Sequence, residues 1–176
     1  ATYLVTGGLG RIGLHVAQWL ADRGARHLCL VGSTGASTPI RQSAVAALET
    51  RGVRVRVVAA DVADPAAMVA LIADLADGPP VRGVVHAAGV LSDSMLVTQD
   101  EESMRHVFVP KASGAWYLHK HTQSLDALEV FVVYSSVASL FGNVGQANYS
   151  AANAYMDELV RWRVSQGLCG LSVQWP

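Results

Sequence analysis

Short apolar runs alternate along the chain with longer stretches in which apolar residues recur at helical spacing. In the first such stretch Ile12, Val16, Trp19 and Leu20 stand three or four positions apart or adjacent, which predicts an amphipathic helix. Runs rich in valine and leucine lie on either side of it, as expected for buried strands. This alternation predicts repeated strand–helix–strand units, and hence an α/β fold with a parallel sheet.

The same pattern predicts the bounds of each element. Strands are predicted at 3–6, 27–31, 53–59, 83–86, 130–134 and 171–174. Helices are predicted through 12–20 and over 42–51, 65–76, 101–121 and 151–164. Asp64 before Pro65 is a typical helix start, because aspartate caps free N–H groups and proline needs no N–H in the first turn. No internal repeat or linker divides the chain, so residues 1–176 are predicted to form a single domain.

Both ends of the chain fall on predicted strands, without a tail. We therefore expect the core of a larger multidomain protein, with the sheet truncated at its C-terminal end. No secretory leader precedes the first strand, and Cys29 and Cys169 lie far apart, with Cys29 inside an apolar run. These features favour a reduced, cytoplasmic protein.

Composition narrows the possible classes of function. Apolar residues make up 51% of the chain and charged residues 15%, which is too hydrophobic for a disordered protein. No apolar run approaches the roughly 20 residues of a membrane-spanning helix. The 13 basic and 14 acidic side chains are scattered, without the basic stripe of a nucleic-acid-binding protein. The histidines show no metal-site spacing. We expect no nucleic-acid, membrane or metal partner.

A glycine-rich segment between the first predicted strand and the first predicted helix indicates a nucleotide site. Glycines permit a tight turn and let backbone N–H groups approach a pyrophosphate at the positive end of the helix. Glycines here also suit packing alone, but strand, helix and spacing together favour binding. The predicted fold is therefore α/β, with a Rossmann-like, doubly wound parallel sheet flanked by helices. The segment reads Thr6, Gly7, Gly8, Leu9, Gly10, Arg11, Ile12, Gly13.

The ends of the third and fourth predicted strands add candidate cofactor contacts. Asp61, followed by Val62, is placed to accept a hydrogen bond from an adenine amino group, although a turn-capping aspartate is an equal alternative. Small residues after the fourth strand would let a ribose and a pyrophosphate lie over the sheet edge, although they also suit simple packing. They follow in the run His86, Ala87, Ala88, Gly89.

Polar side chains later in the chain predict an active site. Ser136 lies where the fifth strand leaves the sheet, and open α/β sheets bind ligands at the carboxyl ends of their strands. Tyr149 and Asn153 are four positions apart at the start of a helix and so share one face. Each alone would be an ordinary surface residue, but together they follow a nucleotide motif.

These segments together resemble a short-chain dehydrogenase/reductase. More narrowly, they resemble the catalytic subdomain of a ketoreductase domain from a modular polyketide synthase or an animal-type fatty acid synthase. Ordinary short-chain reductases carry a lysine four residues after the tyrosine, where this chain has Asn153. The synthase ketoreductases exchange these two residues, and Lys111 stands in the matching place. The resemblance covers essentially the whole chain, through Gly7 to Gly13, His86 to Gly89, Pro110-Lys111, Gly114-Ala115-Trp116, Ser135-Ser136 and Gly145 to Asn153.

The resemblance implies NADPH-dependent reduction of a β-ketoacyl thioester on an acyl carrier protein, with other domains of the same synthase as partners. Tyr149 would donate a proton to the β-carbonyl oxygen, and Ser136 would hydrogen-bond and orient the same oxygen. A free tyrosine has a pKa of about 10, so a nearby Lys111 ammonium would favour the phenolate. Asn153 would hold Lys111 or a proton-relay water in position.

The cofactor end departs from the family pattern. Related ketoreductases carry an arginine for the 2′-phosphate where this chain has Ser33 and Thr34, and no Asp or Glu stands there to bind a free ribose. The two hydroxyls are able to bond a phosphate, with Arg11 or Arg41 supplying charge. NADPH is the expected cofactor, held less tightly than by a bidentate arginine.

Two positions bear on stereochemistry. Leu91-Ser92-Asp93 falls where B-type members, which give the D-configured alcohol, carry Leu-Asp-Asp, and Phe141 replaces the tryptophan of A-type members. Both favour a B-type domain, although Asp93 is alternatively a loop-capping carboxylate.

Two other classes of function stay open. One is a reductively silent scaffold domain that has lost cofactor binding, and the other is a free-standing short-chain dehydrogenase.

Overall fold

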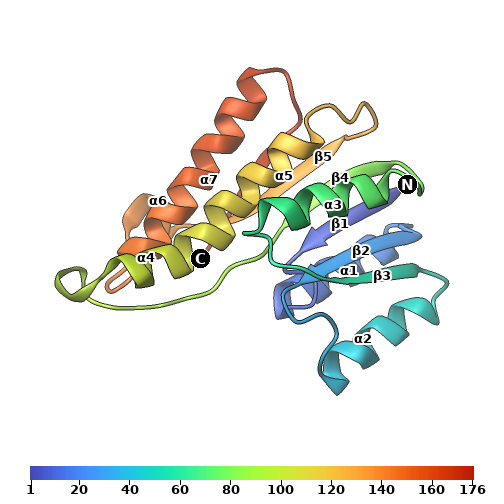
Figure 1. Ribbon diagram of the computed structural model, residues 1–176, viewed down its shortest axis with the longest axis horizontal. Coiled ribbons are helices and arrows are strands. Elements are labelled where there is room, and N and C mark those ends of the chain that lie inside the picture. The colour runs from blue at the N-terminus through green and yellow to red at the C-terminus, as the bar shows by residue number, and fades with distance from the viewer.

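Six parallel strands form the centre of the protein (Figure 1). The computed structural model describes all residues, 1–176, and the strands lie in the order β3-β2-β1-β4-β5-β6. Each strand lies within two residues of its predicted bounds, and the predicted parallel, Rossmann-like sheet is confirmed. The strands are β1 Thr2–Thr6, β2 His27–Gly32, β3 Arg54–Ala59, β4 Val81–His86, β5 Val130–Ser136 and β6 Leu171–Trp175.

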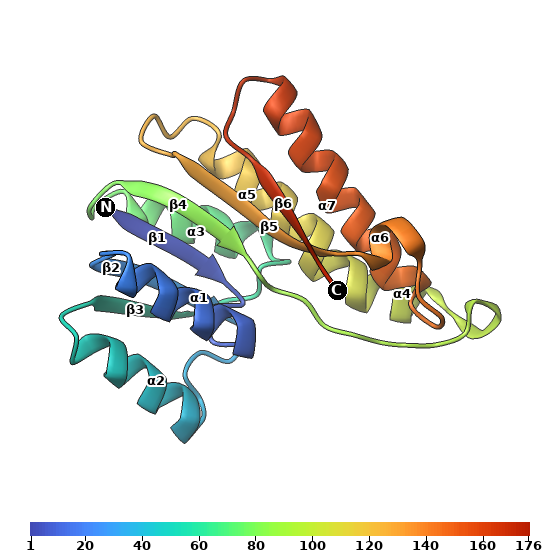
Figure 2. The same ribbon diagram turned by 180° about the vertical axis from the view of Figure 1, so that it is seen from behind.

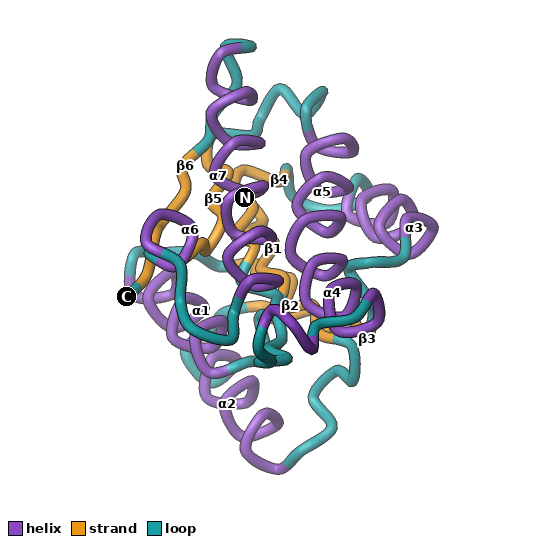
Figure 3. The backbone as a smooth tube through the Cα atoms, turned by 90° about the vertical axis from the view of Figure 1, so that its left-hand side faces the viewer, coloured by secondary structure: helices purple, strands orange, loops and turns teal.

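Helices lie on both faces of this sheet. Helices α1 and α2 cover one face, and α3, α5 and α7 cover the other (Figures 1 and 3). No helix is both long enough and apolar enough to cross a membrane. The α-helices are α1 Arg11–Asp22, α2 Pro39–Glu49, α3 Pro65–Leu75, α4 Glu101–Phe108, α5 Gly114–Thr122, α6 Ala138–Phe141 and α7 Ala147–Ser165; a 3₁₀ turn, η1, spans Leu96–Thr98 and a π-helical turn, η2, spans Val109–Ser113.

The side-chain alternation of the strands produces two hydrophobic cores. Leu4 and Val84 are buried against α3, α5 and α7, whereas their chain neighbours Val5 and Val85 are buried on the side of α1 and α2. Because both faces of these central strands are covered, their sequences are continuous apolar runs rather than alternating ones. On β5 and β6 the second face has no helix over it, as Figure 2 shows, and Trp175 on that part of the sheet is 45% exposed.

The helix starts follow from capping residues. Asp64 caps α3 as predicted, and its carboxylate accepts hydrogen bonds from the N–H groups of Ala66 and Ala67 at 2.8 and 3.3 Å. Helix α2 begins at Pro39 after the capping residue Thr38, so the predicted start at 42 was too late. Proline fits the first turn of a helix because the N–H that it lacks would have no partner there.

Two helical predictions needed correction where the active-site segment lies. The predicted helix over 101–121 is α4 and α5 joined by the π-helical turn η2, which contains Pro110 and Lys111. Proline cannot donate the α-helical hydrogen bond, and π turns are frequent at functional sites. Helix α7 begins at Ala147 rather than at 151, so Tyr149 is already helical. The short elements η1 and α6 carry no periodic pattern and were not predicted.

Candidate functional site

A cleft of about 970 Å³ opens at the carboxyl ends of β1, β2, β3 and β4. The strand order reverses between β1 and β4, and open α/β sheets bind ligands at such a point. Helix α4 contributes Glu101, Glu102, Arg105 and His106 to its wall, none of which was predicted. The predicted cofactor residues that line the cleft are Gly7, Leu9, Gly10, Ser33, Thr34, Asp61, Val62, Ala87, Ala88 and Gly89.

The other predicted cofactor residues lie behind or beside the cleft wall and do not line it. A Cβ atom on Gly13 would lie 2.2 Å from the carbonyl oxygen of Gly7, so glycine there lets α1 pack directly on the turn. Thr6 and His86 are fully buried and join β1 to β4 through a 2.7 Å contact between the hydroxyl and Nδ1. The six residues of this group are Thr6, Gly8, Arg11, Ile12, Gly13 and His86.

The turn after β1 offers backbone N–H groups to a ligand. Gly7 has a φ of 67°, and a Cβ atom there would lie 2.5 Å from the carbonyl oxygen of Ala87. The α1 N-cap, Gly10, has no capping side chain, and the first turn contains no acidic residue. The first N–H groups of the helix are therefore available at its positive end, which suits a pyrophosphate.

Ser33, Thr34 and Arg41 form a polar group at the β2 end of the cleft. The Arg41 guanidinium donates a hydrogen bond to Thr34 Oγ1 at 2.8 Å and lines the cleft with both hydroxyl residues. The structure thus places a cation from α2 where the sequence motif after β2 lacks one. Across the cleft, Asp61 Oδ1 accepts a hydrogen bond from the N–H of Ala63 at 2.9 Å, so Asp61 is a turn-capping residue and a cleft residue at once.

Ser136 and Tyr149 lie on two elements that pack together, β5 and α7. Ser136 is the last residue of β5, is 7% exposed, and its Oγ accepts a hydrogen bond from the N–H of Ala138 at 3.1 Å. That bond uses a lone pair of the hydroxyl and leaves its proton free for a ligand. Tyr149 lies in the first turn of α7, and its N–H donates to Asn148 Oδ1 at 2.7 Å.

Lys111 lies against the Tyr149 ring. Its Nζ is 5.0 Å from the ring centroid and donates a hydrogen bond to the carbonyl oxygen of Tyr134 at 3.2 Å. The lysine is 4% exposed, and burial lowers its pKa to about 8, against the attraction of Asp157, which raises it. The ammonium form therefore predominates at neutral pH.

A buried histidine fixes the backbone at Lys111. His86 Nε2 lies 3.0 Å from the carbonyl oxygen of Lys111, and because a carbonyl only accepts, Nε2 carries the proton. Nδ1 then accepts from the Thr6 hydroxyl. Burial, followed by the Lys111 charge, lowers the pKa of His86 to about 4, so the ring is neutral. The chain Thr6–His86–Lys111 connects β1 and β4 to η2.

Asn153 does not hydrogen-bond Lys111 directly. Its amide Nδ2 donates to the Tyr149 carbonyl oxygen at 2.8 Å, within α7, and its Oδ1 is buried without a partner. A buried acceptor without a partner is rare and is commonly satisfied by a water. Of the two roles that the sequence suggested, holding a proton-relay water fits this geometry better than holding Lys111.

Two loops are tied together ahead of Tyr149. Gln146 Nε2 donates to both oxygens of Asp93, at 3.1 and 3.0 Å, and Asn148 Nδ2 donates to the Ser92 carbonyl oxygen at 2.8 Å. The loop that carries Asp93 thereby touches the start of α7. Gln146 and Asn148 belong to the motif around Tyr149, yet this contact was not predicted, because nothing in the sequence spacing pairs them with residues more than 50 positions away.

The geometry defines a doubly wound α/β fold with a cleft where the strand order reverses and a buried lysine against a tyrosine ring where η2 packs on α7. Residues 1–176 match the family model of the KR domain. The chain belongs to the ketoreductase domains of polyketide synthases, which are of the short-chain dehydrogenase/reductase type. No group of three or more His, Cys, Asp or Glu side chains is arranged to hold a metal ion.

Similar proteins are synthases and their excised domains. The chain is 46% identical over 174 residues to polyketide synthase GfsA of Streptomyces halstedii, covering 99% of the chain and 2% of the synthase. It is 41% identical over 175 residues to mycoketide-CoA synthase of Mycobacterium tuberculosis, covering 99% and 4%. The chain thus spans a small fraction of these relatives.

Solved structures share the fold closely. The ketoreductase PlmKR1, from the first module of phoslactomycin biosynthesis in Streptomyces sp. HK803, has a TM-score of 0.93 at 39% identity, with 99% of this chain and 40% of that chain covered. A structure of A-type ketoreductases from a modular polyketide synthase has a TM-score of 0.94 at 43% identity, with 99% and 37% covered.

Proposed function

We propose that the protein reduces a β-ketoacyl thioester, carried on an acyl carrier protein of the same synthase, to the β-hydroxyacyl thioester with NADPH. The observation that carries the proposal is the buried Lys111 ammonium against the Tyr149 ring, on a helix that packs against the strand ending in Ser136. An acid-catalysed carbonyl reduction needs a proton donor and a hydrogen-bond donor at one oxygen, and the Tyr149 and Ser136 hydroxyls would supply them.

Each candidate catalytic residue has its own role in the proposed reduction. When bound, the nicotinamide supplies a hydride to the β-carbon. Ser136 donates a hydrogen bond to the carbonyl oxygen and orients it, and Tyr149 transfers its hydroxyl proton to the same oxygen. The positive charge of Lys111 favours the phenolate that Tyr149 then becomes. Asn153 Oδ1, a buried acceptor without a protein partner, would hold a water that returns a proton to the tyrosine.

The cleft fits a phosphorylated dinucleotide. Gly7 lets the turn after β1 pack directly on the backbone of Ala87 at the cleft, and the α1 N-terminus offers free N–H groups to a pyrophosphate. At the β2 end, Arg41 with Ser33 and Thr34 supplies a cation and hydroxyl donors suited to a 2′-phosphate. Asp61 remains the proposed partner of the adenine amino group. These residues favour NADPH over NADH.

Replacing Tyr149 tests the mechanism. Tyr149→Phe keeps the ring against Lys111 but removes the transferable proton, so we expect reduction to fall by roughly 10²- to 10⁴-fold. NADPH affinity should stay within a few-fold, because Tyr149 does not line the cofactor cleft. Reduction of a β-ketoacyl thioester and NADPH fluorescence titration measure the two quantities.

Tyr155→Phe is the matched control, because Tyr155 lies on the same helix but packs edge-on to Phe108, whereas the Lys111 ammonium lies over the Tyr149 ring. It should reduce the thioester at nearly the wild-type rate. A Tyr149→Phe protein that reduces as fast as Tyr155→Phe would refute the assigned proton donor. A wild-type protein that does not bind NADPH would instead support the silent scaffold domain.

We also propose the B-type, D-configured product. Asp93 holds Gln146 ahead of α7, so the loop that carries it sets the shape of the substrate entrance beside Tyr149. Overall similarity does not decide the type, since a relative of 43% identity is described as A-type. The support is local: Asp93 is present, and Phe141 stands in place of tryptophan, 83% exposed.

Chiral chromatography of the product from a diketide thioester tests the stereochemistry. We expect a predominantly D-configured alcohol, and a hundredfold preference between poses needs only about 2.7 kcal/mol. Asp93→Ala frees Gln146 and should lower that preference. An L-configured product from the wild type overturns the B-type assignment, and unchanged selectivity in Asp93→Ala removes Asp93 from its explanation.

A further inference from the structure

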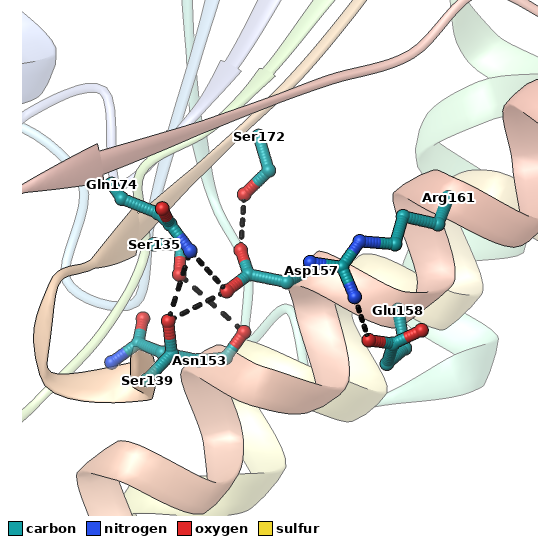
Figure 4. Close-up of polar contacts among 8 residues, drawn as sticks. All are labelled: Ser135, Ser139, Asn153, Asp157, Glu158, Arg161, Ser172 and Gln174. Atoms are coloured by element: carbon teal, nitrogen blue, oxygen red, sulfur yellow. Dashed lines mark hydrogen bonds and ion pairs between the residues drawn. The ribbon is translucent and has the colours of Figure 1, made fainter. Parts of the chain in front are cut away.

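A buried carboxylate lies on α7, one helical turn beyond Asn153. Asp157 is 6% exposed and accepts hydrogen bonds from Ser139 at 2.6 Å, from Gln174 at 2.8 Å and from Ser172 (Figure 4). Burial alone would raise the pKa of Asp157, but these hydrogen bonds outweigh it and lower the pKa below its ordinary value. A buried, ionised carboxylate thus joins α7 to α6 and β6 without any direct ion pair.

Lys111 and Asp157 lie at adjacent residues of β5: the Lys111 ammonium contacts the Tyr134 carbonyl, and the Asp157 carboxylate lies within reach of the Ser135 hydroxyl. Lys111 Nζ donates to the Tyr134 carbonyl oxygen at 3.2 Å, while the next side chain, Ser135, points toward α7, with its hydroxyl 3.4 Å from the Asn153 carbonyl oxygen. The ammonium has no other hydrogen-bond partner in the protein. Opposite charges in a buried environment attract over longer distances than on the surface, because water screens them less.

Asp157 is the anion that acts on this lysine. Its charge raises the pKa of Lys111 against the larger lowering caused by burial. The residues in contact with Lys111 supply no other carboxylate: they are His86, which is neutral, Tyr134 and Tyr149. The titratable groups on the elements packed against η2 are Arg82 and His86 on β4, Tyr134 on β5, Glu101, Glu102, Arg105 and His106 on α4, Tyr117, His119, Lys120 and His121 on α5, and Tyr149, Tyr155, Asp157, Glu158, Arg161 and Arg163 on α7.

A second connection runs from Asp157 to the residue that orients the substrate. Ser139 Oγ lies 2.6 Å from Asp157 Oδ2 and 2.8 Å from the carbonyl oxygen of Ser136. One hydroxyl has one proton, and a charged carboxylate is a stronger acceptor than a carbonyl, so Ser139 donates to Asp157. The turn that follows Ser136 is thereby held onto α7.

We propose that Asp157 is a positioning residue for the reduction: its carboxylate keeps the buried Lys111 protonated and, through Ser139, holds the turn that carries Ser136. For its catalytic consequence this inference rests on the proposed reductase function. The charge pairing between Asp157 and Lys111 does not depend on that function. Without Asp157, the ammonium keeps one hydrogen bond and no counter-charge, and a buried, unpaired cation releases its proton more readily.

The titration of Lys111 tests the pairing directly. The chain contains only two lysines, Lys111 and the exposed Lys120, so NMR of lysine labelled with ¹³C at Cε gives two signals, one an internal reference. In the wild type the Lys111 signal should titrate near pH 8. In Asp157→Asn its midpoint should fall to about pH 7, while the Lys120 signal should not move.

Ser172→Ala is the matched control, because it removes one hydrogen bond to Asp157 and keeps the charge. Its Lys111 midpoint should stay near the wild-type value. An unchanged midpoint in Asp157→Asn, or an equal fall in both variants, overturns the proposal. These readouts need no turnover, so failure of the pairing is distinguishable from failure of the proposed function.

Stability and pH profiles complete the test. If Asp157→Asn fails to fold or is strongly destabilised because it strands a buried cation, Lys111→Met should restore stability in the double variant. A double variant no more stable than Asp157→Asn contradicts the pairing. If Asp157→Asn still reduces the thioester, the alkaline limb of its kcat/KM profile should move to lower pH, by about tenfold in proton concentration. The Lys111 midpoint should move with it. An alkaline limb that does not move contradicts the positioning role.

Discussion

At the scale of single residues, the environment of each side chain decides its role. Lys111 and Lys120 lie on one continuous helical segment, but only Lys111 is buried against a tyrosine ring and close to a carboxylate. Asp61 and Asp157 likewise differ, since Asp61 caps an exposed turn at the cleft and Asp157 is buried in a network. The same residue types thus serve binding, positioning or solubility according to their contacts.

Arg41 is predicted to select the phosphorylated cofactor. Arg41→Gln removes the cation beside Ser33 and Thr34, so NADPH affinity should fall about tenfold, the scale of one charge-assisted hydrogen bond in a partly solvated site. NADH affinity should hardly change, because NADH has no 2′-phosphate. Fluorescence titration with both cofactors measures the two effects, with Arg23→Gln, remote from the cleft, as the control.

Ser33→Arg provides the reciprocal experiment. It places an arginine at the β2 end of the cleft, where related domains carry one, and should tighten NADPH but not NADH by about 1.5 to 3 kcal/mol. Equal changes for both cofactors, in either variant, would mean that this end of the cleft does not face the adenosine ribose.

At the scale of elements, a buried arginine fixes the C-terminal end of α7 to the sheet. Arg163 is 1% exposed; its Nε donates to the Cys169 carbonyl oxygen at 2.6 Å and its Nη1 to His119 Nδ1 at 2.8 Å. The guanidinium also lies 4.1 Å from the centroid of the Phe131 ring. The arginine therefore connects α7, α5, β5 and the loop before β6.

Arg163→Met should lower the free energy of unfolding by about 2 to 4 kcal/mol, because it leaves the Cys169 carbonyl and the His119 ring buried without partners. Arg161→Met is the control two residues away, since Arg161 makes a surface ion pair with Glu158 in which both side chains are about two-thirds exposed. That change should cost under about 1 kcal/mol. Urea denaturation compares the two variants, and equal losses would contradict the role given to Arg163.

At the scale of the whole molecule, two buried neutral histidines make stability depend on pH. Burial lowers the pKa of both His86 and His119, for His86 to about 4. The unfolded chain takes up a proton at each histidine near pH 6.5, whereas folded His86 does so only near pH 4. Acid therefore favours the unfolded state across that window, and the stability gained from these rings is fully present only above it.

The expected loss from His86 is about 2 kcal/mol between pH 7 and pH 5. His86→Gln should flatten the fall in unfolding free energy over this range, although its stability at pH 7 will be lower because the bonds to Thr6 and Lys111 are disturbed. His15→Gln, on the exposed face of α1, should leave the slope as it is. Urea unfolding at several pH values measures it, and a slope that His86→Gln does not change would contradict this account.

The sequence alone determined the strand–helix alternation and the parallel sheet, and it selected candidate cofactor residues most of which the structure brings to one cleft. Apolar runs and helical periodicity are local properties, and the glycine turn and the Tyr149 motif are contiguous segments with a defined place after a strand or in a helix. The predicted starts of α2 and α7 were too late, because a first turn that contains proline or polar residues shows no apolar periodicity. The π-helical turn around Lys111 was not predicted, because apolar residues at helical spacing do not distinguish a π-helical turn from an α-helical one.

Only the tertiary structure decided the contacts between distant segments. The cation of Arg41 reaches Thr34 from another element, Gln146 meets Asp93 across 53 positions, and Asp157 gathers donors from α6 and β6. The physical reason is that burial, pKa and hydrogen-bond satisfaction depend on what packs around a group in space, and the separation of residues along a chain does not fix it.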